Sequence, residues 1–127
     1  MTSATVIIVD YGAGNLRSVA KAVERVGYQV RVTDDPREVL GARAVILPGV
    51  GASDSAIRAL RERGLAEPLQ TVIRNSVPLF GVCLGMQLLL DSSEEGSEPC
   101  LGVVAGRVKR FLPGAKVPHM GWNQVDL

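Results

Sequence analysis

Continuous apolar runs alternate along the chain with stretches in which apolar residues recur at three- and four-residue spacing. The runs at residues 4–10, 43–51 and 77–83 are typical of strands that are buried in a sheet. Residues 28–33 alternate between polar and apolar positions, and this alternation predicts a half-buried strand. The pattern therefore predicts four strands before residue 84.

A helical pattern follows each of the first two strands. Asn15 could cap the first helix, whose apolar residues continue to Val26, and Gly27 suits the left-handed position just past a helix end. Residues 34–42 supply a turn and a short helical piece. The first half of the chain thus reads strand, helix, strand, short helix.

The same rhythm continues after residue 51. Ser53 or Asp54 could cap a helix that stops at Gly64, and Pro68 could open a second helix. A last helix is expected from Leu84 to about residue 91. Strands that alternate with helices predict an α/β fold in which a mostly parallel sheet is covered on both faces, a three-layer arrangement.

In such a sheet the ligand crevice lies at the carboxyl ends of the strands. Three loops that contain glycine fall at such ends, at residues 12–14, 49–51 and 81–85. We therefore expect any functional site to lie among these loops.

Beyond residue 91 the pattern changes. Residues 92–100 are a polar loop, and residues 101–127 carry shorter alternating runs with turn signals, which predict antiparallel strands or a hairpin. The last five residues stop within an expected strand, so we expect an incomplete carboxyl end. No linker or repeat suggests a second domain, and residues 1–127 are interpreted as one partial domain.

Composition narrows the possible functions. Fourteen basic and thirteen acidic residues leave a net charge of +1, without the basic patch of a nucleic-acid binder. No apolar run approaches the roughly 20 residues that span a bilayer, and no signal peptide precedes the first strand. We expect a cytoplasmic protein with reduced thiols, no membrane segment, no metal ion and no organic cofactor.

Cys83 is the strongest candidate for chemistry. It stands in Gly81-Val82-Cys83-Leu84-Gly85, the G-x-nucleophile-x-G pattern in which a strained turn from strand to helix exposes the central side chain. The positive end of the helix would favour the thiolate, and the N–H of Leu84 could donate to an oxyanion. The alternative interpretation is a small buried thiol, although the flanking strand and helix favour the nucleophile.

The other motifs are less specific. Cys100 follows Glu98 and Pro99 in the polar loop and is interpreted as structural. The 47–51 sequence "LPGVG" could aim a backbone N–H at a neighbouring site, but Pro-Gly also marks ordinary turns. The 10–15 sequence "DYGAGN" lacks the spacing of a dinucleotide loop and the lysine of a P-loop, which argues against a nucleotide site.

Taken in order, "LPGVG", "GVCLGMQLL", "SEEG" and "PHMGWN" resemble the class I glutamine amidotransferases, and among them the glutaminase subunits of imidazole glycerol phosphate synthase. The resemblance covers essentially the whole chain and implies a flavodoxin-like fold. It also implies that L-glutamine is hydrolysed through a cysteine thioester. The ammonia would pass to a partner (β/α)8-barrel cyclase, which forms imidazole glycerol phosphate and aminoimidazole carboxamide ribonucleotide in histidine biosynthesis.

The resemblance assigns roles to single residues. Cys83 matches the nucleophile, and the oxyanion hole matches Leu84 together with two residues of the glycine loop, Val50 and Gly51. Two more positions match residues that hold the substrate glutamine, Gln87 and Glu95. Without the resemblance, Gln87 could equally be a solvated helix residue and Glu95 one member of an exposed acidic run.

The resemblance further places a cyclase contact at Asn15 and at the segment His119, Met120, Gly121, Trp122 and Asn123. A tryptophan packed in the core is the alternative interpretation of Trp122. His119 is the only histidine in the chain, and it could be structural, an interface residue or a substitute base.

One feature departs from the family pattern. The family's base is a histidine in a His-Pro-Glu motif, and residues 1–127 contain no such motif. Because loss of a triad member costs several orders of magnitude in rate, we expect this chain to be a poor glutaminase. Two alternatives stay open: a non-catalytic module that docks on a cyclase, and an α/β hydrolase with a cysteine nucleophile.

Overall fold

The structure is a computed structural model that describes residues 4–127. Its main elements follow the predicted order of strands and helices. They are β1 (Thr5–Val9), α1 (Leu16–Arg25), β2 (Gln29–Thr33), α2 (Pro36–Leu40), β3 (Val45–Leu47), α3 (Ser53–Glu62), α4 (Ala66–Arg74), β4 (Leu79–Gly81) and α5 (Leu84–Gln87), followed by the short strands β5 (Ser92–Ser93) and β6 (Arg107–Val108).

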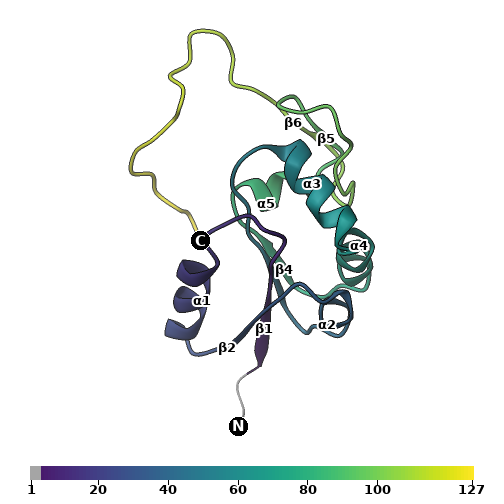
Figure 1. Cartoon of the computed structure of the whole chain (residues 1–127). Coiled ribbons are helices and arrows are strands. Elements are labelled where there is room, and N and C mark those ends of the chain that lie inside the picture. Colours follow the sequence, from purple (N-terminus) through teal and green to yellow (C-terminus); the bar gives the residue numbers. More distant parts are fainter. Residues whose placement is uncertain (1–3) are drawn as a thin grey trace.

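The four longer strands form one parallel sheet in the order β2-β1-β3-β4. Helices cover it as parallel strands require, with α1 on one side and α2, α3 and α4 on the other (Figure 1). This arrangement confirms the predicted α/β class with a mostly parallel central sheet. It also brings the carboxyl ends of β1, β3 and β4 side by side.

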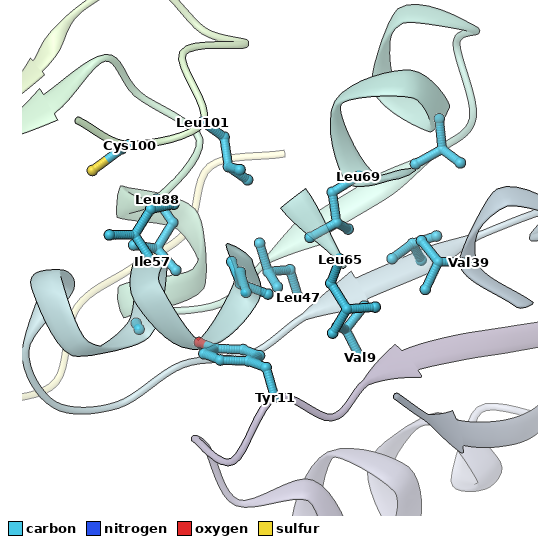
Figure 2. Close-up of a cluster of buried hydrophobic side chains, with 14 of the residues drawn as sticks. Val9, Tyr11, Val39, Leu47, Ile57, Leu65, Leu69, Leu88, Cys100 and Leu101 are labelled. Atoms are coloured by element: carbon cyan, nitrogen blue, oxygen red, sulfur yellow. The ribbon is translucent and has the colours of Figure 1, made fainter. Parts of the chain in front are cut away.

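The hydrophobic core lies between the sheet and α2, α3 and α4. Alternate strand residues such as Val9 and Leu47 point into it, where they meet Ile57 of α3 and Leu69 of α4 (Figure 2). Tyr11 closes this core at the carboxyl end of β1, where its side chain is almost fully buried. The core therefore extends up to the sheet edge that carries the glycine loops.

The face that α1 covers is more open. The strand register aligns Val32, Ile8, Ile46 and Phe80 in one row across the sheet. Ile8 is fully buried, whereas Val32 and Phe80 at the two ends of the row are 43% and 67% exposed. The expectation that both faces are covered holds only in part, because the ten-residue helix α1 covers this face alone among the described helices and packs mainly against β2 and β1.

The predicted helix starts are partly correct. Asn15 caps α1, since its side-chain oxygen accepts a hydrogen bond from the Ser18 N–H at 3.2 Å. Ala52 is the N-cap residue of α3, and neither Ser53 nor Asp54 caps it, because both already lie within the first turn. Helix α4 begins two residues before Pro68, which is tolerated because N–H groups of a first turn lack helical partners.

The last predicted helix is shorter than expected. Helix α5 ends at Gln87, and the carbonyls of Leu88, Leu89 and Leu90 accept hydrogen bonds from N–H groups of residues 101–104. These carbonyls are therefore not used to continue the helix, and these N–H groups are not used to pair with a neighbouring strand. The turn after Gln87 is therefore not a continued helix, and residues 101–104 are not a strand.

The antiparallel strands predicted for residues 101–127 are also wrong. The only pairing within this region involves β6, and β6 runs parallel to β5. Residues 109–127 form no helix or strand, so the strand expected at the end of the chain is absent from the described residues. Among residues 4–127, no helix has the length and apolar character needed to cross a membrane.

Candidate functional site

The elbow after β4 has the strained backbone that the G-x-C-x-G pattern predicts. Cys83 lies at φ 55° and ψ −119°, and it is one of two non-glycine residues with positive φ among those described. Such a conformation costs of order 1–3 kcal/mol and persists only where the surroundings enforce it. The Cys83 side chain is exposed, so the alternative of a buried thiol does not describe it.

Close packing of two glycines enforces the elbow. A Cβ added at Gly81 would lie 2.7 Å from the Met86 Cα, so only a bare backbone lets α5 fold back on β4. A Cβ at Gly85 would collide with the carbonyl oxygen of Leu47 at the end of β3. The elbow and the end of the neighbouring strand are thus in direct contact.

The loop after β3 lies against the same turn. A Cβ at Gly49 would approach the Gly85 nitrogen to 2.7 Å, which places Gly49 beside the first turn of α5. Val50 is 64% exposed, and Gly51 adopts a φ of 100° that glycine tolerates best. Among residues 4–127, the N–H groups of Leu84, Val50 and Gly51 donate to no backbone carbonyl. An oxyanion hole requires N–H groups that are free to donate, and these three meet that condition.

Gln87 follows Cys83 by one helical turn, and its side-chain oxygen is buried without a hydrogen-bond partner among the described residues. Buried polar atoms in native proteins are nearly always paired. The Gln87 oxygen therefore offers a vacant acceptor to a ligand that carries an N–H group. The solvated helix residue that was the alternative does not fit this burial.

Glu95 is exposed on the loop that follows β5, residues 94–98, here called the Glu95 loop, and α3 holds this loop in place. The Asp54 carboxylate accepts hydrogen bonds from the Ser97 N–H at 3.0 Å and from the Glu98 N–H at 2.8 Å. These bonds hold the pKa of Asp54 below its usual value. The 48–51 loop leads into the first turn of α3, and Asp54 in that turn binds the Glu95 loop. Both loops are therefore attached to the start of α3.

The proposed interface residues lie in two different settings. Asn15 caps α1, while residues 119–123 are exposed and irregular. Trp122 is fully exposed, so the alternative of a core tryptophan is wrong. The His119 ring packs edge-on against Phe111, with ring centroids 6.5 Å apart, and among residues 4–127 it forms no hydrogen bond with Cys83.

The remaining site expectations concern Cys100 and metals. Cys100 is a buried core residue, as predicted, and burial raises the pKa of its thiol. Within the described part of the chain, no group of three or more His, Cys, Asp or Glu side chains could hold a metal ion.

Two residues that hold the loops of this site were not predicted to do so: Tyr11, and Asp54, which the sequence offers only as a helix cap. Tyr11 donates a hydrogen bond to the Pro48 carbonyl, and Asp54 anchors the Glu95 loop. Both contacts join residues that are far apart in the chain, and no local pattern records such contacts. The only signal was position, since Tyr11 opens the first glycine loop and Asp54 follows the second.

Comparison with protein families places this geometry in context. The family model described as "Glutamine amidotransferase class-I" matches residues 7–125. A relative named imidazole glycerol phosphate synthase subunit HisH, from Dehalococcoides mccartyi (strain CBDB1), is 50% identical over 121 residues, which cover 94% of this chain and 59% of that protein. A protein of the same name from Moorella thermoacetica (strain ATCC 39073 / JCM 9320) is 54% identical over 94% of this chain and 58% of its own length.

The chain thus spans about three fifths of the length of the curated relatives it matches. Among solved structures, one described as "Crystal structure of glutamine amidotransferase" has a TM-score of 0.70 and 27% identity, covering 87% of this chain and 59% of that one. A putative peptidase E from Listeria monocytogenes EGD-e has a TM-score of 0.58 and 16% identity, over 71% of this chain and 51% of its own, which shows a shared fold alone.

Proposed function

Because the chain belongs to the class I glutamine amidotransferase family, we propose that it binds L-glutamine as the glutaminase subunit of an imidazole glycerol phosphate synthase and that Cys83 is its nucleophile. One observation carries this proposal. Cys83 is exposed on a strained elbow that packs directly against the 48–51 loop. A strained, exposed cysteine beside unpaired N–H groups fits attack on a carbonyl carbon.

The chemistry follows from these groups. The Cys83 thiolate attacks the side-chain carbonyl carbon of glutamine, and a C–S bond forms while the carbonyl oxygen becomes an oxyanion. The N–H groups of Leu84, Val50 and Gly51 are the donors proposed for that oxyanion. When the oxyanion collapses, the C–N bond breaks, and the amide nitrogen takes up the proton that the Cys83 thiol lost and leaves as ammonia. Water then hydrolyses the glutamyl thioester to glutamate and the free thiol.

Two side chains are proposed to hold the substrate. The vacant acceptor of Gln87 suits an N–H group of glutamine, one turn from the nucleophile. The Glu95 carboxylate suits the α-ammonium group, because such charge-assisted hydrogen bonds are stronger than neutral ones. The burial of the Gln87 oxygen and the anchored Glu95 loop support both assignments.

Proton transfer limits the activity that we propose for residues 1–127. Their single histidine, His119, forms no hydrogen bond with Cys83 among the described residues, and they contain no His-Pro-Glu motif. A nucleophile without its base keeps only part of its rate enhancement. We therefore expect ammonia release from glutamine to be slow.

The proposed partner is a (β/α)8-barrel cyclase, which would use the ammonia to form imidazole glycerol phosphate and aminoimidazole carboxamide ribonucleotide in the cytoplasm. The names of the relatives as synthase subunits support a partner, as does the exposure of Trp122 and Met120 in the 119–123 segment. Co-sedimentation of this chain with a cyclase would support the complex. Failure to co-sediment would remove both the partner and the alternative of a non-catalytic docking module.

Selective labelling tests the nucleophile. A glutamine analogue with a chloromethyl ketone in place of the side-chain amide should form one adduct on Cys83, since the sulfur displaces chloride. Peptide mass spectrometry should find no adduct in Cys83→Ser and an unchanged adduct in Cys100→Ser. A Cys83 that instead turns over simple esters and ignores the glutamine analogue would favour the α/β hydrolase.

A further inference from the structure

The first glycine loop carries a buried hydroxyl that contacts the loop beside Cys83. Tyr11 follows β1 by two residues, and its hydroxyl donates a hydrogen bond of 2.6 Å to the Pro48 carbonyl. Pro48 directly follows β3, the neighbour of β1 in the sheet. The bond therefore ties the ends of two adjacent strands together at the edge where Cys83 lies.

The hydroxyl also limits where Gly49 can lie. A Cβ added at Gly49 would stand 2.5 Å from the Tyr11 oxygen on one side and 2.7 Å from the Gly85 nitrogen on the other. Gly49 is thus enclosed between Tyr11 and the first turn of α5. The first glycine loop also packs against Pro48 itself, because a Cβ added at Gly14 would lie 3.1 Å from the Pro48 Cβ.

From these contacts we infer that Tyr11 is a positioning residue, whose hydroxyl holds Pro48 and Gly49 against the first turn of α5 and so fixes the Val50 and Gly51 N–H groups that are proposed as donors to the oxyanion. The inference rests on the proposed function, because it concerns the oxyanion of the same reaction. It gives the "DYGAGN" sequence, which lacks the spacing of a nucleotide-binding loop, a structural role beside Cys83. A merely structural Tyr11 would fill the core with its ring, and its oxygen would be incidental.

The electrostatic setting of Tyr11 agrees with this role. Burial, followed by the negative charge of Cys83, raises the pKa of Tyr11 to about 12. The hydroxyl therefore keeps its proton and remains a donor throughout the physiological pH range.

The test compares two reagents that alkylate Cys83, of which only one reacts through an oxyanion that an oxyanion hole can stabilise. Cys83 can add to the ketone carbonyl of the glutamine chloromethyl ketone to give an oxyanion, from which the sulfur transfers to the neighbouring CH2 carbon and chloride leaves. With iodoacetamide the sulfur displaces iodide directly, and no oxyanion forms. Tyr11→Phe keeps the ring and removes only the hydroxyl. Tyr28→Phe is the matched control, because Tyr28 is half exposed and its hydroxyl makes no hydrogen bond among residues 4–127. Urea unfolding confirms that each variant is folded.

The rate with the chloromethyl ketone relative to iodoacetamide should fall about three- to tenfold in Tyr11→Phe, the effect of one lost hydrogen bond, and should stay unchanged in Tyr28→Phe. Backbone ¹⁵N order parameters should fall at Val50 and Gly51 and not in α4. An unchanged rate ratio in Tyr11→Phe, or a loss of order spread equally over α4, would overturn the inference. If the unmodified chain shows no preference for the chloromethyl ketone, the proposed function itself fails, and this inference fails with it.

Discussion

Two glutamines in this chain differ in whether their side chains are paired. The Gln70 amide nitrogen donates to the Leu101 carbonyl at 2.9 Å, whereas the Gln87 oxygen is buried without a partner among the described residues. An unpaired buried polar atom costs about 1–3 kcal/mol. A ligand with an N–H group would remove that cost, and this is the physical reason for assigning Gln87 to substrate binding.

Substitution of each glutamine by methionine separates binding from stability. Gln87→Met should leave the free energy of unfolding in urea unchanged or higher. Because substrate binding weakens, L-glutamine should protect Cys83 against alkylation about fivefold less well in this variant. Gln70→Met should lower the free energy of unfolding by about 1 kcal/mol, whereas L-glutamine should protect Cys83 as well as it does in the unmodified chain. Equal protection in both variants would remove Gln87 from the site.

Asp54 is the residue whose ionisation matters for the Glu95 loop. Hydrogen bonds from the Glu98 and Ser97 N–H groups lower its pKa in the folded chain. A group with a lowered folded pKa stabilises the fold above its unfolded pKa, and this contribution is lost as the pH falls through the folded value. The stabilising contribution of ionised Asp54 is therefore lost below about pH 4, since the aspartate carboxyl of a model peptide takes up its proton near that pH.

Hydrogen exchange measures this dependence. The Ser97 and Glu98 amides should exchange slowly at pH 5 and lose their protection as the pH falls below about 4. In Asp54→Ala both amides should be unprotected at every pH. Glu94→Ala is the control, because Glu94 accepts from the Arg110 N–H and not from this loop. Protection that survives in Asp54→Ala would show that another contact holds the Glu95 loop.

At this scale the sequence predicted the residues with local signatures and missed those that act at a distance. Cys83 stands in a pattern of five consecutive residues, and Asn15 directly precedes the helix that it caps. Tyr11 and Asp54 act across 37 and 44 residues of chain, respectively. Only the strand order, which brings the ends of β1 and β3 together, makes the Tyr11 contact visible.

Among the elements, the strand, elbow and short helix around Cys83 were predicted best. Glycine at both ends of the elbow is required by contacts that a side chain would disrupt, and the sequence records such a requirement directly. The length of α5 was not predictable, because the carbonyls of the next three residues, 88–90, accept hydrogen bonds from N–H groups of residues 101–104. The parallel pairing of β5 and β6 likewise joins residues that are far apart in the chain.

The close approach at Gly85 gives a prediction for the elbow. In Gly85→Ala the added methyl group meets the carbonyl oxygen of Leu47, so the free energy of unfolding should fall by about 3 kcal/mol. Reaction of Cys83 with the glutamine chloromethyl ketone should also slow.

Gly41→Ala is the matched control for Gly85→Ala. The nearest atom to an added Cβ at Gly41 is the Arg37 carbonyl oxygen at 3.6 Å, and Gly41 has a negative φ. Its stability should stay the same or rise by up to about 1 kcal/mol. Urea unfolding of both variants checks the pair, and equal stability of the two would contradict the close packing of α5 on β3.

For the whole molecule, the α/β class and the parallel sheet follow from the alternation of apolar runs and helical spacing. How well each face is covered does not, since the exposure of Val32 and Phe80 depends on where α1 lies on the sheet. The candidate site is a property of the same scale. Its parts come from the loops after β1, β3 and β4, which only the parallel order of those strands brings to one edge.

The central claim is that Cys83 is a nucleophile positioned for glutamine. The most direct measurement is the rate of Cys83 alkylation by the glutamine chloromethyl ketone at increasing concentrations of L-glutamine, with D-glutamine as the control. We predict that L-glutamine slows the reaction in a saturable manner, that D-glutamine does not, and that Cys100 stays unmodified. A rate that is independent of L-glutamine, or equal protection by the two enantiomers, would contradict the claim.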